Sequence, residues 1–325
     1  MTFDFIHIGL AKCMSTTLQT QWARSENYRL EPATRIAHGC EQIVEQHANN
    51  LENLPSINVK VPDGPDGVSV ISAETLTYSY WDKPTLAHLI PVKQQYAADS
   101  VSHLSRKALI IVRDPIRWIH SAHAQSINQG GFESLQEFVH SHRNVLIQNL
   151  NLGRILQMWE QKGLEITVLS MEGFNQEPER FWQRYESSLG VPRPSHMAEI
   201  TGVSRNASHY ERLELAARIN QLQNRLAGLV DQGDSPDLKD KAIVMNALKQ
   251  AQRWGARRAL HTATEAEVDS MQALFNPEGF WDFHAFTLDS EFLDHLEEHY
   301  ITPLDRHPAL STQLAGYRES LHAVR

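Results

Sequence analysis

The first 190 residues alternate short apolar runs with longer segments in which apolar residues recur every three or four positions. Short runs rich in β-branched and aromatic residues are typical of buried strands, and the longer periodicity is typical of amphipathic helices. The pattern predicts strands at residues 5–8, 68–74, 108–112 and 166–170. Strands that alternate with helices favour an α/β fold with an open, mostly parallel sheet and helices on both faces.

Beyond residue 191 the strand-like runs disappear and helical periodicity remains. Leu215, Ile219, Leu222 and their successors predict one helix, and similar patterns predict others at residues 243–254 and near 290–300. Thr264 and Glu267 have the spacing of a capping box, which predicts a further helix after them. We therefore expect an α/β core over residues 1–210 and an all-helical C-terminal extension over residues 211–325.

Composition and charge narrow the possible partners. The 325 residues carry a net charge of −9, which argues against nucleic acid as a partner, because such binding needs a basic surface. No segment approaches the length of a membrane span, and no secretory leader pattern is visible, so we expect a cytoplasmic protein without a membrane partner. Two cysteines do not indicate a disulfide framework, and no His, Cys and Asp cluster has metal-ligand spacing.

The turn after the first strand carries the first candidate chemistry. Gly9 ends the apolar run, and the polar residues Lys12, Ser15, Thr16 and Thr17 follow before a helix that begins near Leu18. A strand, a turn with a lysine, and a helix together present backbone N–H groups and a positive helix end to an anion. This spacing differs from that of a Walker A loop, because Met14 and Ser15 stand where its second Gly and its Lys belong. A nucleotide-dependent kinase is therefore disfavoured.

A second motif follows the strand at residues 108–112. It reads Arg113-Asp114-Pro115, and Ser121 lies eight residues after the arginine inside the next predicted helix. A guanidinium group binds phosphate through two parallel hydrogen bonds, and a hydroxyl two helical turns further on can reach the same phosphate. The alternative is a structural turn in which Arg113 pairs internally with Asp114 or Glu172.

Together the two motifs resemble those of sulfotransferases that use 3′-phosphoadenosine-5′-phosphosulfate (PAPS), and the chain looks closest to bacterial members. Gly9, Lys12, Thr16 and Leu18 occupy positions of the family's 5′-phosphosulfate loop. Two residues depart from it: Ala11 replaces a proline, and Met14 replaces a glycine. Because methionine reaches positive φ only at a cost, the loop either keeps a negative φ there or holds the donor differently.

The resemblance implies a P-loop-like core in which the loop binds the 5′ end of the nucleotide and the second motif binds its 3′-phosphate. The implied donor-binding residues are Lys12, Cys13, Met14, Ser15, Thr16, Thr17, Arg113 and Ser121. PAPS would be the sulfuryl donor and 3′,5′-ADP the product, with no metal involved. The acceptor would be the hydroxyl or amine of a small molecule or carbohydrate, and the helical extension would pack on the core or cover the acceptor site.

Two residues are the catalytic candidates by the same resemblance. Lys12 would neutralise the leaving phosphate, and Glu74 stands near the position of the family's general base. Glu74 has the alternative of a surface carboxylate or a helix-end charge, and His120 and His123 are weaker candidates for the base. His7, inside the first strand, is expected to be a hydrogen-bonded core residue.

A different class of protein remains open. A non-catalytic nucleotide-binding protein could keep the fold and lose turnover, and Ala11 and Met14 in the loop favour it. A softer likeness to the same family after the strand at residues 166–170 assigns Glu172 a structural part, in which it ties its segment to the Arg113 turn. The sequence does not indicate the oligomeric state.

Overall fold

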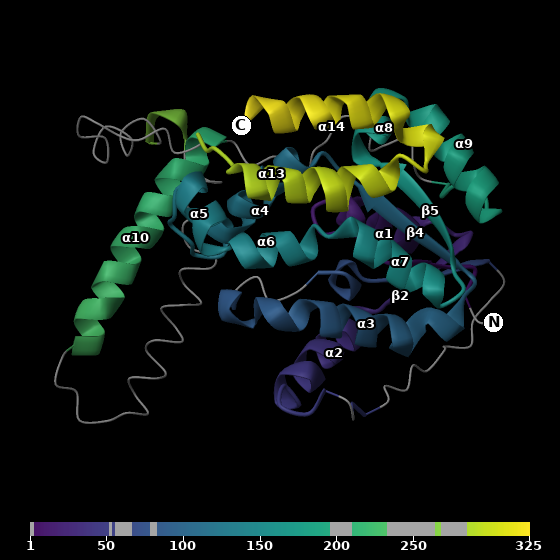
Figure 1. Cartoon of the computed structure of the whole chain (residues 1–325), viewed down its shortest axis with the longest axis horizontal. Coiled ribbons are helices and arrows are strands. Elements are labelled where there is room, and N and C mark those ends of the chain that lie inside the picture. The colour runs from purple at the N-terminus through teal and green to yellow at the C-terminus, as the bar shows by residue number, and fades with distance from the viewer. Residues whose placement is uncertain are drawn as a thin grey trace. The chain divides into compact units, whose positions relative to one another are not determined.

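The structure is a computed structural model (Figure 1), which describes residues 3–51, 54–55, 67–78, 83–195, 210–232, 264–267 and 285–325. The chain packs into two compact units. The first comprises Met1–Trp118, His142–Val203 and Leu288–Arg325, and the second comprises Ile119–Ser141 and Ser204–Thr287. These units do not follow the expected boundary after residue 210, because the last segment of the chain packs with the sheet.

The first unit contains a five-stranded sheet in the order β2-β3-β1-β4-β5, and every neighbouring pair is parallel. The strands are β1 (Phe5–His7), β2 (Tyr28–Pro32), β3 (Val68–Ser72), β4 (Lys107–Val112) and β5 (Glu165–Ser170). The three central strands β3, β1 and β4 consist almost entirely of buried residues, as expected for strands covered on both faces. The predicted parallel α/β sheet is confirmed.

The register brings several strand ends to one edge of the sheet. His7 lies opposite Ser72 on β3, and Val112 lies opposite Ser170 on β5. The residues that follow β1, β3 and β4 therefore emerge side by side. Ligands of open α/β sheets bind at this carboxyl edge.

Two strands differ from the sequence-based prediction. The pattern did not reveal β2, because Tyr28–Pro32 is a polar edge strand that ends in proline and has only one buried residue. The predicted strand at residues 68–74 stops at Ser72, and Glu74 instead begins the 3₁₀ helix η2 (Glu74–Leu76). Glu74 is consequently on a turn beyond the strand.

The helices of the first unit connect these strands. They are α1 (Ser15–Arg24), α2 (Thr34–Gln46), η3 (Pro84–Leu89), α3 (Ile90–Val101), η4 (Ser102–Leu104), α6 (Arg143–Asn149), α7 (Leu152–Gln161), α8 (Met171–Gln176) and α9 (Pro178–Leu189). The connection from β1 to β2 crosses the sheet in one direction and the other three cross in the opposite direction. Because such crossovers are right-handed, α1 lies on one face, and α2, α3 and α7 lie on the other.

The C-terminal segment of the first unit is helical, as predicted. It contains α13 (Ser290–Leu296), the π-helix η6 (Glu297–Ile301), the 3₁₀ turns η7 (Thr302–Leu304) and η8 (Pro308–Leu310), and α14 (Ser311–Ala323). Figure 1 shows α13 and α14, in yellow, running beside each other. The helix expected near residues 290–300 is therefore present, whereas α14 was not predicted.

The second unit contains α5 (Leu135–Ser141), α10 (Tyr210–Gln232) and the larger part of α4 (Pro115–Asn128), which begins in the first unit. Its core joins Ala124 and Ile127 of α4 to Leu213, Leu215, Ala216 and Ala217 of α10. The helix predicted from Leu215 onward is confirmed as α10. No helix in the described ranges is long and apolar enough to cross a membrane.

The capping box at Thr264 is also present in the second unit. The Thr264 amide donates to Glu267 Oε2 at 2.7 Å, and the Glu267 amide donates to Thr264 Oγ1 at 3.3 Å. The body of the helix that this box would begin, and the helix predicted at residues 243–254, lie outside the described residues.

Candidate functional site

The loop between β1 and α1 has an unusual backbone. Lys12 has a φ of 65° and Met14 a φ of 53°, and Met14 is the N-cap of α1. Left-handed backbone costs a non-glycine residue roughly 1–2 kcal/mol, and strain of this kind is concentrated at functional sites. The possibility that the loop keeps a negative φ at Met14 is therefore wrong, and the possibility that it holds the donor differently stays a prediction. The loop thereby keeps the conformation that glycine would allow.

Each carbonyl from Gly9 to Lys12 has a hydrogen-bond donor. Thr77 Oγ1 donates to the Gly9 oxygen at 2.5 Å, the Cys13 amide donates to Leu10 at 3.3 Å, and Trp118 Nε1 donates to Ala11 at 2.5 Å. The fourth donor is Arg113, whose Nη1 lies 3.2 Å from the Lys12 oxygen. The loop is thus fixed through its acceptors before any ligand binds. Such preorganisation favours a site for an anion at the N-terminus of α1.

Gly9 lies where β1, η2 and α1 approach one another closely. A Cβ atom at this position would come within 3.0 Å of the Glu74 Cα and within 3.1 Å of Ser15 Oγ. Ser15 Oγ is buried and has no hydrogen-bond partner in the described part of the chain. A buried polar atom of this kind at a helix N-terminus is a donor that an anion could satisfy.

Arg113 brings the second motif to the first. Its guanidinium group has five N–H donors in a planar fork, and the bond to Lys12 uses one of them. The alternative, internal pairing with Asp114 or Glu172, is not what the structure shows. Asp114 Oδ1 accepts the amides of Ile116 and Arg117 at 2.9 and 3.0 Å as the cap of α4. Glu172 Oε1 accepts the Asp114 amide at 3.2 Å, the structural contact that the resemblance suggests.

Glu74 lies beside the same loop, on the turn after β3. It is half-buried, and burial raises its pKa while the Lys12 cation acts in the opposite direction. A carboxylate with a raised pKa near a lysine has the character expected of a general base more than that of a solvated surface group. Its role stays a prediction.

Sequence reasoning missed the residues that hold this turn. Lys93 Nζ donates to the carbonyls of Thr75 and Tyr78, and Gln94 Nε2 donates to that of Thr77. Lys93 is almost fully buried on α3, and burial lowers its pKa to about 8. A lysine in a helix that is otherwise largely apolar is the only sequence signal that could have identified it.

The other predicted site residues differ in their exposure. Cys13 is fully buried, and burial raises the pKa of its thiol, which disfavours the nucleophilic thiolate form. Thr16 is exposed and Thr17 is half-buried on the first turn of α1. Ser121 is half-buried on the part of α4 that belongs to the second unit. Its role also stays a prediction.

The histidines differ from one another. His7 is fully buried, Nδ1 lies 2.8 Å from Ser72 Oγ, and burial lowers its pKa to about 3, in agreement with the expected core role. His123 is buried in the second unit, with Nε2 2.8 Å from the Glu133 carbonyl. His120, also in the second unit, packs against Phe286 with the two rings nearly perpendicular. The contacts of His123 favour a structural role.

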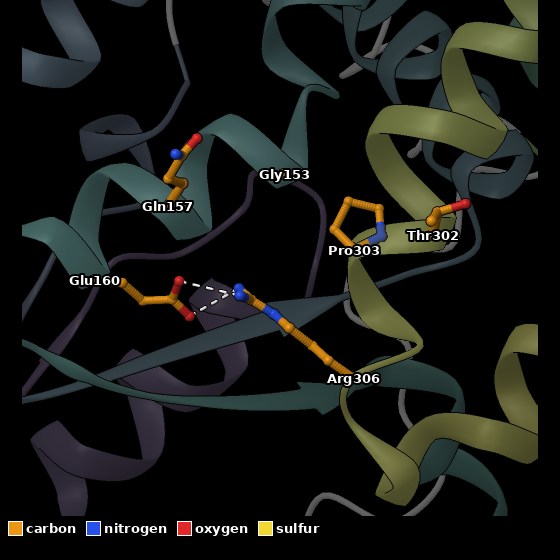
Figure 2. Close-up of a pocket in the computed structure, with 6 residues that line it drawn as sticks. All are labelled: Gly153, Gln157, Glu160, Thr302, Pro303 and Arg306. Atoms are coloured by element: carbon orange, nitrogen blue, oxygen red, sulfur yellow. Dashed lines mark hydrogen bonds and ion pairs between the residues drawn. The ribbon is translucent and has the colours of Figure 1, made fainter.

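An open groove of about 530 Å³ lies elsewhere in the first unit (Figure 2). Its lining residues come from α7 and from the turn after η6, namely Gly153, Gln157, Glu160, Thr302, Pro303 and Arg306. Arg306 contacts both carboxylate oxygens of Glu160 at 2.8 and 3.1 Å, as Figure 2 shows. None of the predicted site residues lines it, so it does not contribute to the candidate site.

Comparison with known proteins does not assign the chain to a family. No protein-family model, curated protein or solved structure matches the chain. Within the described residues, no group of three or more His, Cys, Asp or Glu side chains could hold a metal ion. The loop, the Arg113 turn and the Glu74 turn therefore carry the functional argument by themselves.

Proposed function

We propose that the chain is a PAPS-dependent sulfotransferase that transfers a sulfuryl group to a hydroxyl or amine of a small-molecule or carbohydrate acceptor. One observation carries this proposal: the Arg113 guanidinium lies 3.2 Å from the Lys12 carbonyl. The two motifs offered for the 3′ and 5′ ends of the nucleotide are 101 residues apart in the chain, and this side-chain-to-backbone contact joins them at one edge of the sheet.

The topology supports the same location. Strand β1 lies between β3 and β4, and its connection leaves toward one face while theirs leave toward the other. Adjacent strands whose connections diverge define a topological switch point, where open α/β sheets bind their ligands. The loops that follow these three strands carry Lys12, Glu74 and Arg113.

In this proposal each group has a distinct task. Lys12 and the N-terminus of α1 stabilise the charge that develops on the leaving 5′-phosphate, and Arg113 binds the 3′-phosphate. The part of Ser121 in that binding rests on the family resemblance alone. Glu74 takes the proton from the acceptor hydroxyl as its oxygen attacks sulfur, while the S–O bond to the phosphate breaks in line. The strained loop, whose carbonyls from Gly9 to Lys12 are all hydrogen-bonded, supplies the positioning.

The donor site can be tested without knowledge of the acceptor. We expect 3′,5′-ADP to raise the melting temperature, because a ligand at 100 times its Kd stabilises the folded state by about 2.7 kcal/mol. Lys12→Ala and Arg113→Ala should abolish most of that shift. Arg106→Ala is the matched control, since Arg106 is exposed and precedes β4 at its opposite end. Unchanged shifts in both site variants would remove the assignment.

The same measurement separates the alternatives. Stabilisation by ATP with Mg²⁺ but not by 3′,5′-ADP would favour a kinase. Stabilisation by 3′,5′-ADP without product from a broad panel of alcohols, phenols, amines and sugars would favour a non-catalytic nucleotide-binding protein.

Glu74→Gln tests the base. Loss of a general base typically lowers turnover by about 10²–10⁴-fold, and the affinity for 3′,5′-ADP should change little. Glu31→Gln, a change at a half-buried carboxylate near the end of β2, is the control. Equal turnover in wild type and Glu74→Gln would clear Glu74 of this role. The acid limb of the activity profile should lie above the pH expected of an ordinary glutamate, because burial raises the Glu74 pKa.

A further inference from the structure

The backbone of Arg113 is held by a tyrosine from the far end of the chain. The Tyr300 hydroxyl donates to the Arg113 carbonyl at 2.6 Å and accepts the Arg113 amide at 3.3 Å. Tyr300 is fully buried, and burial raises the pKa of its hydroxyl well above the ordinary range, so it stays a donor. One hydroxyl group therefore fixes both peptide groups of the residue whose guanidinium is offered to the ligand.

Two more C-terminal hydroxyls reach the adjacent residue. Ser320 Oγ donates to Asp114 Oδ2 at 2.6 Å, while Asp114 Oδ1 caps α4. The Tyr317 hydroxyl donates to Glu172 Oε2 at 2.6 Å, and Glu172 Oε1 accepts the Asp114 amide. Both side-chain oxygens of Asp114 and its amide are thus engaged, and two of these three contacts depend on α14.

The helical segment that carries Tyr300 is anchored by buried apolar residues, which hold Tyr300 beside the Arg113 backbone. Phe292 and Leu296 of α13 and Leu304 of η7 follow at intervals of four and eight residues and are buried, as Tyr300 is. The turn between them, Glu297–Ile301, is a π-helix. Single π turns are rare in proteins, and those that occur are frequently found at functional sites.

We propose that Tyr300 is a positioning residue for Arg113, and that the segment from α13 to α14 is a structural part of the donor site. This inference rests on the proposed donor role of Arg113. If this inference holds, the C-terminal helices do more than cover the acceptor site. They hold the turn after β4, whose Arg113 would bind the 3′-phosphate. A rigid backbone lets the guanidinium meet the phosphate without a further loss of conformational freedom.

Tyr300→Phe removes the hydroxyl and keeps the ring. We expect its affinity for 3′,5′-ADP, measured by calorimetry, to fall about tenfold, the upper end for a single hydrogen bond. In an Arg113→Ala background, titrated at nucleotide concentrations high enough to measure the weakened binding, the same change should have little further effect, because Tyr300 acts through Arg113. Additive losses would overturn the inference, since a merely structural tyrosine would weaken both backgrounds equally.

A matched control is Tyr28→Phe. Tyr28 is also buried, and its hydroxyl contacts Tyr185 and the Pro192 carbonyl at a distance from the loop. The Tyr28→Phe change should lower the melting temperature without changing the affinity for 3′,5′-ADP. Ser320→Ala is a second site variant that keeps the test available if Tyr300→Phe does not fold, and we expect a loss of about threefold.

Hydrogen exchange of the ligand-free protein separates the two proposals. Tyr300→Phe should raise the exchange rate of the Arg113 and Asp114 amides by about tenfold, with β5 as an unaffected reference. Unchanged exchange at these amides would overturn the positioning role whatever the protein binds. Faster exchange in a protein that does not bind 3′,5′-ADP would support the structural contact, overturn the proposed function and leave Tyr300 no donor site to position.

Discussion

Single residues determine the shape of the loop after β1. Gly9 is favoured because a Cβ would lie only 3.0 Å from the Glu74 Cα and 3.1 Å from Ser15 Oγ, so a neighbour would have to move by a few tenths of an ångström. Met14, by contrast, takes a conformation that glycine would adopt without strain. The loop thus keeps glycine where space demands it and tolerates a larger residue where only φ is at stake.

Gly9→Ala should therefore be destabilising. The added methyl group would push Glu74 or Ser15 away, at a cost of about 1–3 kcal/mol typical of overpacking. Gly316→Ala on α14 is the control, because nothing lies within 4 Å of its Cβ position, and alanine in a helix gains about 0.5–1 kcal/mol. Urea unfolding measures both. An equally stable Gly9→Ala would mean that the three segments are less tightly packed than described.

His7 makes a second residue-scale prediction. Its pKa is about 3 in the folded state against 6.5 for the free side chain, so the unfolded chain binds the extra proton between these values. The contribution of neutral His7 to the free energy of unfolding is fully present above pH 6.5 and is lost as the pH falls toward 3. At pH 4 the loss is about 3 kcal/mol.

The measurement is the free energy of unfolding from pH 7 to pH 4. His7→Gln should show a shallower decline than wild type, because glutamine does not titrate. His103→Gln, at an exposed histidine, should decline in parallel with wild type. Parallel curves for all three proteins would contradict the assignment of His7 as a neutral buried residue.

At the scale of elements, periodicity predicted most of the sheet. Strands β1, β3, β4 and β5 were visible because buried strands are continuous apolar runs. The edge strand β2 was not visible in the sequence, because its formation depends on pairing with β3, and the local sequence does not reveal that neighbour. For the same reason α14 was missed: its apolar residues are few, and its burial comes from contacts with η6 and η8.

The first turn of α4 illustrates how one element holds another. Trp118 Nε1 donates to the Ala11 carbonyl inside the loop. Trp118→Phe should leave that buried acceptor unsatisfied, at a cost of about 1–3 kcal/mol beyond the lost packing, and should weaken 3′,5′-ADP binding. Trp159→Phe is the matched control on α7. Trp159 is equally buried, but its Nε1 has no partner in the described residues. Equal effects of the two changes would argue against the hydrogen bond as a support of the loop.

At the scale of the whole molecule, the candidate site combines what the sequence could and could not predict. The two motifs were identified from local spacing, because each follows directly on an apolar strand. The sequence did not identify the three hydroxyl residues that support these motifs, because their partners are far away along the chain. Tyr300 lies 187 residues from Arg113, Tyr317 lies 145 residues from Glu172, and Ser320 lies 206 residues from Asp114. Side-chain hydroxyls at such separations leave no periodic signal.

That separation has a consequence for biosynthesis. At about 5–20 residues per second, the ribosome needs roughly 10–40 s to advance from Arg113 to Tyr300. The strands emerge early, but the turn after β4 acquires its last contacts only when α13 and α14 have been translated. Ribosome-bound chains stalled with residues up to 295 exposed should therefore be retained far less on immobilised 3′,5′-ADP than chains stalled with residue 325 exposed. Affinity for the nucleotide would then appear only after the segment from α13 to α14 has been synthesised.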